Sequence, residues 1–198
     1  MPSRIHHQSL LRMCLAVATL GAVAACTQQE PPRTAEAAPV ERGRYLVNIG
    51  GCSDCHTPKL FTADGPASDN SRLLSGHPAA AKLPPLPPGV IGSDQWGAIA
   101  NNDFTAWAGP WGVSFAANLT PDATGLGSWT PENFIQAMRT GKHMGVGRPI
   151  LPPMPWMDLA LMTDEDLRAV FAYLKSLPPV SNAIPAPVPP AENPAPGS

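Results

Sequence analysis

The clearest hydrophobic pattern lies toward the carboxyl end of the chain. Four apolar residues recur there at helical spacing and form one stripe: Leu167, Val170, Phe171 and Leu174. Thr163 precedes this stripe and is followed by three acidic residues, an arrangement typical of a helix amino terminus. The pattern predicts an amphipathic helix from Thr163 to about Ser176.

Two further helices are predicted from their ends. One begins at Thr130, which can cap the helix, continues with Pro131 at the first helical position, and ends at Gly141. The other covers residues 40–49 and is ended by two consecutive glycines. It offers the carboxyl-terminal stripe three apolar partners: Tyr45, Leu46 and Ile49. Gly43 in this helix either permits two backbones to approach closely or is simply a flexible residue.

Residues 57–129 have no sustained helical or alternating pattern and are rich in Pro, Gly, Asn and Trp. A structureless loop of this length is improbable inside a compact domain. We therefore expect ordered, irregular structure with short helical turns. Its aromatic residues either wall a cofactor or simply fill the core: Trp96, Trp107, Trp111, Trp129, Phe104 and Phe115.

The two ends of the chain differ in composition from the middle. Residues 1–25 combine a basic start, a short apolar run and small residues, which predicts a secretory signal peptide. Cys26 follows a sequence similar to a bacterial lipobox, so we expect it to carry lipid; an ordinary cleavage in the same run is the alternative. Residues 26–39 are predicted to be a tether, 40–179 the folded domain, and 180–198 a Pro/Ala-rich tail that is extended or disordered.

Length and charge narrow the possible functions. The chain has 198 residues, with 13 basic and 15 acidic side chains, which suits one domain with a moderate core. Loss of residues 1–25 would remove Arg4 and Arg12 and no acid, leaving a mildly acidic remainder. Such a surface argues against nucleic acid as a partner.

The most specific motif is Cys52-Ser53-Asp54-Cys55-His56, a Cys-x-x-Cys-His pattern. Two thiols at this spacing can each add to a vinyl group of the same porphyrin, while the adjoining imidazole ligates the iron. A redox-active dithiol would require a strand–helix–strand setting, and no buried strand is predicted before Cys52. A zinc site would require a second ligand pair, which the sequence lacks. The motif therefore predicts one covalently attached haem with His56 as an axial ligand.

The other side of the iron has several candidate ligands. We favour Met154, because it lies in the run Pro152-Pro153-Met154-Pro155, whose prolines restrict the backbone and reduce the entropy lost on ordering. Met138, Met157 and Met162 are expected to pack in or near the core. His143 or Met144, in a glycine-rich stretch, remain alternatives.

Several segments resemble bacterial monohaem c-type cytochromes and the haem modules of cytochrome subunits that serve periplasmic dehydrogenases. Besides the motif at Cys52, they are residues 117–122, 124–127, 139–143, 152–156 and 162–167. The resemblance implies a mainly α, cytochrome c-like fold, with three or more helices around one covalent haem and a long irregular insertion. It also implies that Cys52 and Cys55 are the thioether sites and that His56 and Met154 are the axial ligands. Asn118 and Arg139 would then lie near the haem, toward a propionate.

These observations predict a periplasmic electron carrier that exchanges single electrons with redox proteins and has no catalytic residues of its own. Its donor would be a dehydrogenase, and its acceptor a terminal oxidase or another cytochrome. One alternative is a haem enzyme or a gas- or peroxide-binding protein with an open sixth position, where His77 or His143 acts distally. Another is a permanent electron-transfer subunit of a dehydrogenase.

Overall fold

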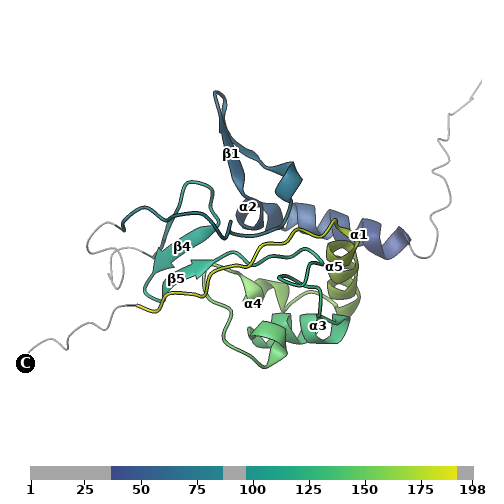
Figure 1. Cartoon of the computed structure of the whole chain (residues 1–198). Helices are drawn as coiled ribbons and strands as arrows, with labels where there is room; N and C mark the ends of the chain where they lie inside the picture. Colours follow the sequence, from purple (N-terminus) through teal and green to yellow (C-terminus); the bar gives the residue numbers. More distant parts are fainter. Residues whose placement is uncertain (1–36, 87–96, 191–198) are drawn as a thin grey trace, which may run out of the picture. The chain divides into compact units, whose positions relative to one another are not determined.

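The structure is a computed structural model that describes residues 37–86 and 97–190 (Figure 1). Four predicted features lie wholly or partly outside these ranges: the signal peptide, residues 26–36 of the tether with Cys26, Trp96, and residues 191–198 of the tail. Within them the α-helices are α1 (Ala37–Ile49), α2 (Cys52–His56), α3 (Pro131–Thr140), α4 (Trp156–Leu159) and α5 (Asp164–Ser176). None of the helices in the described ranges has the length and apolar character needed to cross a bilayer.

The three predicted helices are confirmed together with their caps. At α3 the Thr130 hydroxyl accepts a hydrogen bond from Asn133 N, the Asn133 side chain reciprocates, and Gly141 ends the helix in the left-handed conformation. At α5 the Thr163 side chain accepts from Asp166 N. Helix α1 begins at Ala37, three residues earlier than predicted, because Pro39 falls in its first turn, where no amide donor is required.

Helices α1 and α5 pack directly against each other at Gly43. A Cβ atom on Gly43 would lie 1.9 Å from the Ala169 carbonyl oxygen, so this glycine is required for the close approach. The predicted contact face of α1 is wrong in part: Tyr45 is 55% exposed and Ile49 64% exposed. Val47 is buried instead, because it lies one turn after Gly43 on the same face of α1, the face that packs against α5.

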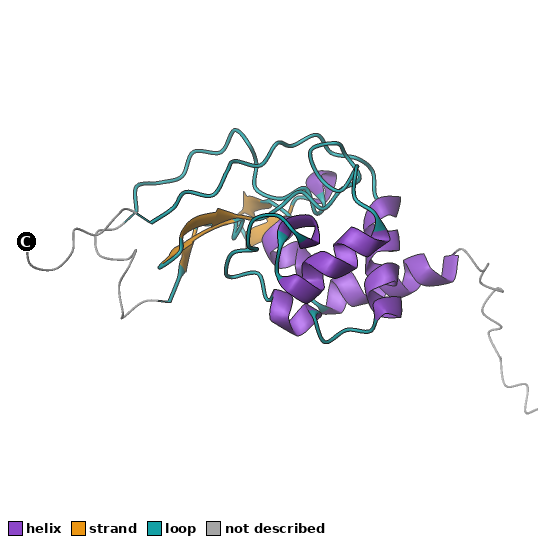
Figure 2. Ribbon diagram, turned by 90° about the horizontal axis from the view of Figure 1, so that it is seen from below, coloured by secondary structure: helices purple, strands orange, loops and turns teal. Residues whose placement is uncertain are grey.

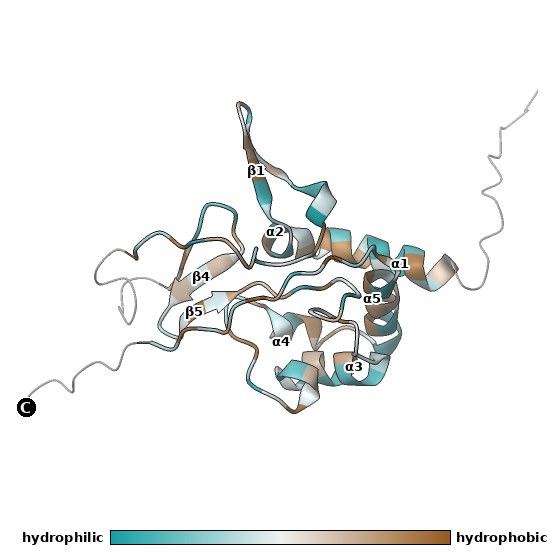
Figure 3. Ribbon diagram, in the orientation of Figure 1, coloured by the Kyte–Doolittle hydropathy of each residue, from teal (hydrophilic) through white to brown (hydrophobic). Residues whose placement is uncertain are grey.

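The core lies where α1, α3 and α5 meet. Figure 2 shows the helices gathered on one side of the domain and the strands on the other. From α5 the residues Leu167, Phe171 and Leu174 are buried, as the helical stripe predicts, and Val170 is half-buried. The rings of Phe134 and Phe171 lie 5.3 Å apart between α3 and α5. Figure 3 shows apolar and polar residues alternating around α1 and α5, as expected for helices that each bury one side.

Between residues 57 and 129 the described parts, 57–86 and 97–129, are ordered, but they are not only irregular. They contain two antiparallel sheets made of β1 (Lys59–Thr62), β2 (Gly65–Ser68), β3 (Ile99–Ala100), β4 (Ala106–Gly109) and β5 (Gly112–Phe115), and a 3-10 turn, η1 (Asn70–Arg72). Tight two-residue turns join β1 to β2 and β4 to β5. Strands of two to four residues are too short to produce a recognisable alternation, so the sequence pattern missed them.

Residues 178–190, which we call the C-terminal strap, are extended and bonded to the domain rather than free of it. Val188 pairs with Val113 through two backbone hydrogen bonds of 2.7 and 2.9 Å. The Asn182 amide donates to the carbonyls of Ser75 and His77, at 2.8 and 2.9 Å. The prolines keep the strap extended, as predicted, but its polar groups join it to segments up to 107 residues distant.

Candidate functional site

Helix α2 presents the Cys-x-x-Cys-His motif as one helical turn. Gly51, in the left-handed conformation with φ of 63°, separates it from α1. Cys52 and Cys55 are three residues apart and therefore lie on the same side of the turn. Both are free thiols and partly buried. Their spacing on one helical face suits attachment to two positions of a single flat group.

The environment of the two thiols argues against a redox-active dithiol. Burial raises the pKa of both Cys52 and Cys55, so each remains a neutral thiol at neutral pH, whereas a reactive cysteine requires a lowered pKa. Nearby Asp54 raises the pKa of Cys55 further, and Lys59 opposes it. The motif does open a helix, but helix α1 precedes it rather than a strand.

One ring nitrogen of His56 is hydrogen-bonded within the protein. Its side chain is buried, with 8% exposure, and Nδ1 lies 2.8 Å from the Ala117 carbonyl oxygen. Because a carbonyl can only accept, Nδ1 carries the proton and Nε2 keeps its lone pair. Burial lowers the pKa of the imidazole, against the smaller raising effect of the bond to Ala117. His56 is therefore a neutral, oriented nitrogen donor.

Hydrogen bonds from the segment around Leu74 to His77 fix the backbone at His56 and also join it to the segment that carries Ala117. The Gly76 amide donates to the His56 carbonyl at 2.7 Å, and the Leu74 amide donates to the Thr57 hydroxyl at 3.0 Å. The His77 amide donates in turn to the Ala116 carbonyl, at 3.0 Å, which ties the segment that carries Ala117 to the same frame. Metal-bound histidines usually have such a carbonyl partner on the second nitrogen.

The donor set fits a haem rather than a structural zinc ion. Over residues 37–86 and 97–190, no group of three or more His, Cys, Asp or Glu side chains is placed to hold a metal ion. Two thiols on one helical face and one tautomerically fixed imidazole instead match covalent attachment of a porphyrin with axial nitrogen ligation. When bound, haem supplies a one-electron couple at its iron.

The segment that carries Met154 is anchored from both sides. The Ile150 amide donates to the Gly141 carbonyl at 2.7 Å, and the Ser114 hydroxyl in β5 donates to the Pro152 carbonyl at 2.6 Å. Met154 is half-buried and packs against the helical core. Its side chain therefore lies on a restrained loop, as the prolines predicted, whereas its ligation of iron stays a prediction.

The other candidate distal ligands occupy different environments. Met138 is buried in the core and Met157 is 65% exposed. His143 begins the 3-10 turn η2 (His143–Gly145), where its ring meets the edge of Trp129 with centroids 5.0 Å apart. His77 is completely buried, and its Nδ1 lies 2.7 Å from the Thr105 hydroxyl.

The Asn118 side chain bonds both the C-terminal strap and its own loop. Its Nδ2 donates to the Val180 carbonyl at 2.8 Å and to the Thr124 hydroxyl at 3.1 Å. Its Oδ1 accepts from both the amide and the hydroxyl of Thr120. The side chain is 3% exposed and both of its polar atoms have protein partners, and its place near a haem propionate stays a prediction.

Arg139 has protein partners near the ends of α4 and α5, and its place near a haem propionate stays a prediction. Its guanidinium donates to the carbonyls of Ala160 and Met162, and to Asp164 Oδ1 at 2.6 Å. These groups lie between α4 and α5, just beyond the Met154 loop. Arg139 thus fixes the connection that follows this loop, and backbone carbonyls as partners leave no signature in the sequence.

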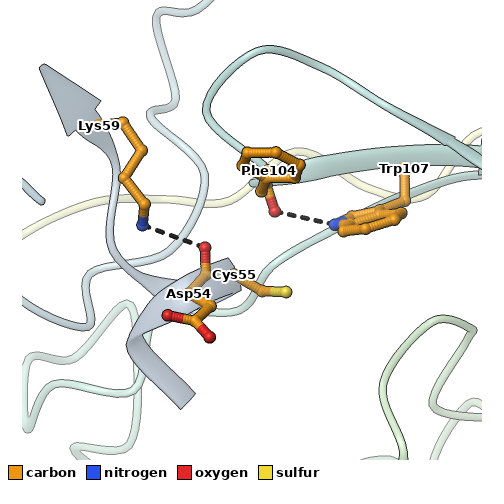
Figure 4. A pocket seen from close by; sticks show the side chains of 5 residues that line it. All are labelled: Asp54, Cys55, Lys59, Phe104 and Trp107. Carbon is orange, nitrogen blue, oxygen red and sulfur yellow. Dashed lines mark hydrogen bonds between the residues drawn. The ribbon is translucent and has the colours of Figure 1, made fainter. Parts of the chain in front are cut away.

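A pocket of about 320 Å³ opens beside the second cysteine (Figure 4). It is lined by Asp54, Cys55, Lys59, Phe104 and Trp107. Phe104 is 44% exposed and has a left-handed backbone with φ of 60°, and its carbonyl accepts a hydrogen bond from the Trp107 indole at 2.8 Å. Two of the predicted aromatic residues therefore reach the attachment motif, whereas Trp129 packs against the core and Phe115 against His77.

Two contributors to the site were missed in the sequence. Ala117 contributes its backbone carbonyl, which cannot be recognised from the type of side chain at that position. Lys59 acts through its ammonium group, and a basic residue shortly after a helix end is a signal that would have found it.

Comparison with known proteins is consistent with this geometry. The chain is similar to the gluconate 2-dehydrogenase cytochrome c subunit of Pantoea cypripedii, with 30% identity over 73% of this chain and 24% of the relative. It is 27% identical to the cytochrome c subunit of the quinone alcohol dehydrogenase of Gluconobacter oxydans, over 79% and 25%. A diheme cytochrome c-type protein of Cereibacter sphaeroides is 28% identical over 71% and 36%. The chain thus spans only about a quarter to a third of the length of these relatives.

The family assignment rests on most of the folded part. Residues 40–178 match the family model for cytochrome c, from α1 through α5. The match includes the attachment motif, the oriented His56 and the Met154 loop. The chain therefore belongs to the cytochrome c family, whose members carry covalently bound haem and transfer electrons.

Proposed function

We propose that this chain carries a single haem, attached through Cys52 and Cys55 and ligated by His56 and Met154, and that it transfers single electrons between redox proteins. The observation that carries the proposal is the 2.8 Å hydrogen bond from His56 Nδ1 to the Ala117 carbonyl. It leaves Nε2 unprotonated and fixes the ring plane, as an axial ligand requires. The single Cys-x-x-Cys-His in the sequence supports one haem.

The chain's own residues would keep both redox states in one geometry. His56 is restrained by the Ala117 and Gly76 bonds, and Met154 by the anchors at its loop. A ligand pair that moves little between oxidised and reduced iron leaves little rearrangement to oppose electron transfer. Ligation by the Met154 thioether would favour the reduced form of the iron.

Substitution of Met154 tests the ligand assignment. We expect Met154→Ala to abolish the thioether-to-ferric-iron charge-transfer band and to let the reduced protein bind carbon monoxide at neutral pH. Met157→Ala is the matched control, because Met157 is 65% exposed on the neighbouring α4 and should leave both properties unchanged. A band that persists in Met154→Ala would reassign the ligand. Rapid, complete carbon monoxide binding by the unaltered protein would favour the open-site alternative.

A permanent association with a dehydrogenase is a second candidate function. It is favoured by the relatives, two of which are cytochrome subunits of gluconate and alcohol dehydrogenases by name. The dehydrogenase would then be the electron donor, and a terminal oxidase or another cytochrome the acceptor. Copurification of the untagged protein from its native membranes separates a subunit from a free carrier.

We further propose that the protein is periplasmic and that lipid on Cys26 anchors it to the membrane. Support comes from the basic and apolar pattern of residues 1–25 and from the small residues before Cys26. Cys26→Ala should move the protein from the membrane to the soluble fraction. An unchanged membrane fraction would exclude this anchor.

A further inference from the structure

Lys59 folds back over the end of the attachment helix. It is the first residue of β1, three positions after His56. Its ammonium group donates to three backbone carbonyls, those of Ser53 at 2.9 Å, Asp54 at 3.0 Å and Thr57 at 2.6 Å. Figure 4 shows the side chain reaching from the strand to the helix beside Cys55. All three donor hydrogens of the lysine are used in one small region.

The end of α2 offers few backbone donors to these carbonyls: the Ser53 carbonyl also accepts from the Thr57 amide at 3.2 Å, and Thr57 itself follows the helix. The last four carbonyls of a helix have no amide donors within it, and α2 is only five residues long. So short a helix is not stable on its own, because the conformational entropy lost in forming its first turn exceeds the stabilisation from the few hydrogen bonds gained. The lysine ammonium adds donors to the carbonyls of Ser53, Asp54 and Thr57 at the negative end of the helix dipole. It thereby restrains the turn that carries Cys55 and His56.

The charge of Lys59 is balanced by dipoles and not by a carboxylate. Among the described residues no acidic side chain lies within ion-pair distance of its ammonium group, and its three partners are neutral carbonyls. The residue is only partly exposed and lines the pocket next to Cys55. A full positive charge therefore stands beside one of the two attachment points, in a pocket that the carboxylate of the exposed Asp54 also lines. Lys59 is half-buried, so solvent screens its charge less than on an open surface.

We infer that Lys59 is a positioning residue for the attachment motif and that its charge raises the reduction potential of the iron. This inference rests on the proposed function, since it requires a haem on Cys52 and Cys55. A nearby cation disfavours the oxidised iron, which carries one more positive charge than the reduced iron. The same ammonium group therefore fixes the helix end and favours the reduced state.

Three substitutions separate the two effects in the haem-bearing protein. Lys59→Met removes both the donors and the charge, Lys59→Gln keeps donors without charge, and Lys59→Arg keeps charge and donors. The control is Lys82→Met, because Lys82 is exposed and its loss changes the net charge by the same amount. The measurements are the midpoint potential by spectroelectrochemistry at low and high salt, and the midpoint of urea unfolding.

We expect lower potentials in Lys59→Met and Lys59→Gln than in Lys82→Met, a difference that persists at high salt, and a near-normal potential in Lys59→Arg. A cap without electrostatic influence would lower only the unfolding midpoint, and unchanged potentials in the Met and Gln variants would overturn the inference. If Lys59→Met accumulates without haem, the comparison of midpoint potentials between Lys59→Gln and Lys59→Arg tests the inference in its place. Failure of the unsubstituted protein to acquire haem would instead refute the proposed function.

Discussion

Gly43→Ala is the substitution whose consequence follows most directly from the structure. The added Cβ would lie 1.9 Å from the Ala169 carbonyl oxygen, 2.5 Å from its carbon and 2.8 Å from Tyr173 Cβ. Ordinary contacts begin near 3.4 Å, so one helix must retreat by about 1.5 Å at this point. The obstacle is the backbone of α5, which cannot rotate away as the end of a side chain can.

The expected cost combines two opposing effects. Overpacking in a tightly packed region costs up to about 3 kcal/mol. Alanine in place of glycine in a helix returns about 1 kcal/mol through its higher helix propensity. We therefore expect a net loss of about 2 kcal/mol in the free energy of unfolding. For a chain of this size that loss lowers the thermal midpoint by about 4–8 °C.

Urea unfolding of the haem-bearing protein at pH 7, followed by far-ultraviolet circular dichroism, measures this loss. Asn48→Ala is the matched control, because Asn48 is exposed on the same helix and its replacement changes only helix propensity. The control should be as stable as the unsubstituted protein or slightly more so. Equal or greater stability of Gly43→Ala would refute the reasoning, since it would mean that α1 and α5 do not touch at this residue.

Two further predictions concern polar anchors. A hydrogen bond from the Ser71 hydroxyl, and to a smaller extent one from Arg72, holds the pKa of Asp69 below its usual range. The stability that ionised Asp69 contributes to the fold is therefore present above about pH 4 and is lost as the pH falls through the lowered pKa. Urea unfolding at a series of pH values should show the advantage of the unsubstituted protein over Asp69→Asn at pH 6 shrinking toward pH 3, and a constant difference would contradict this. Asn182→Ala should cost about 1–3 kcal/mol, because it leaves the Ser75 and His77 carbonyls without their side-chain donor. The neighbouring Ser181→Ala should cost much less, and equal urea midpoints for the two variants would show that the strap is not held at Asn182.

The parts of the fold that were predictable from sequence are those with local signals. Thr130 and Thr163 mark helix starts through their own side chains, and the stripe at Leu167 repeats over two turns. The sheets were not predicted because their strands pair over only two to four residues. The position of the strap was not predicted because it depends on contacts with residues far away in the sequence, at Asn182, Val180 and Val188. A proline-rich segment such as the strap is predicted to be extended whether or not it packs against the domain.

The same distinction applies to the site. Cys52, Cys55 and His56 are identified by spacing because attachment chemistry fixes that spacing. Asn118 and Arg139 were assigned by resemblance alone, and the structure gives their hydrogen-bonding groups to backbone carbonyls and nearby side chains. The carbonyl of Ala117 could not be found from the sequence, since any residue at that position offers one. Local chemistry was predictable, whereas partners contributed by the backbone were not.

The docked strap has a consequence for the order in which the molecule is completed. Val180 receives a hydrogen bond from Asn118, the residue next to the carbonyl that orients His56. Because Val180 lies 62 residues after Asn118, this hydrogen bond forms only after the segment that carries Val180 has been made. A chain that stopped before Val180 would leave the buried amide of Asn118 without this acceptor, next to the residue whose carbonyl orients His56.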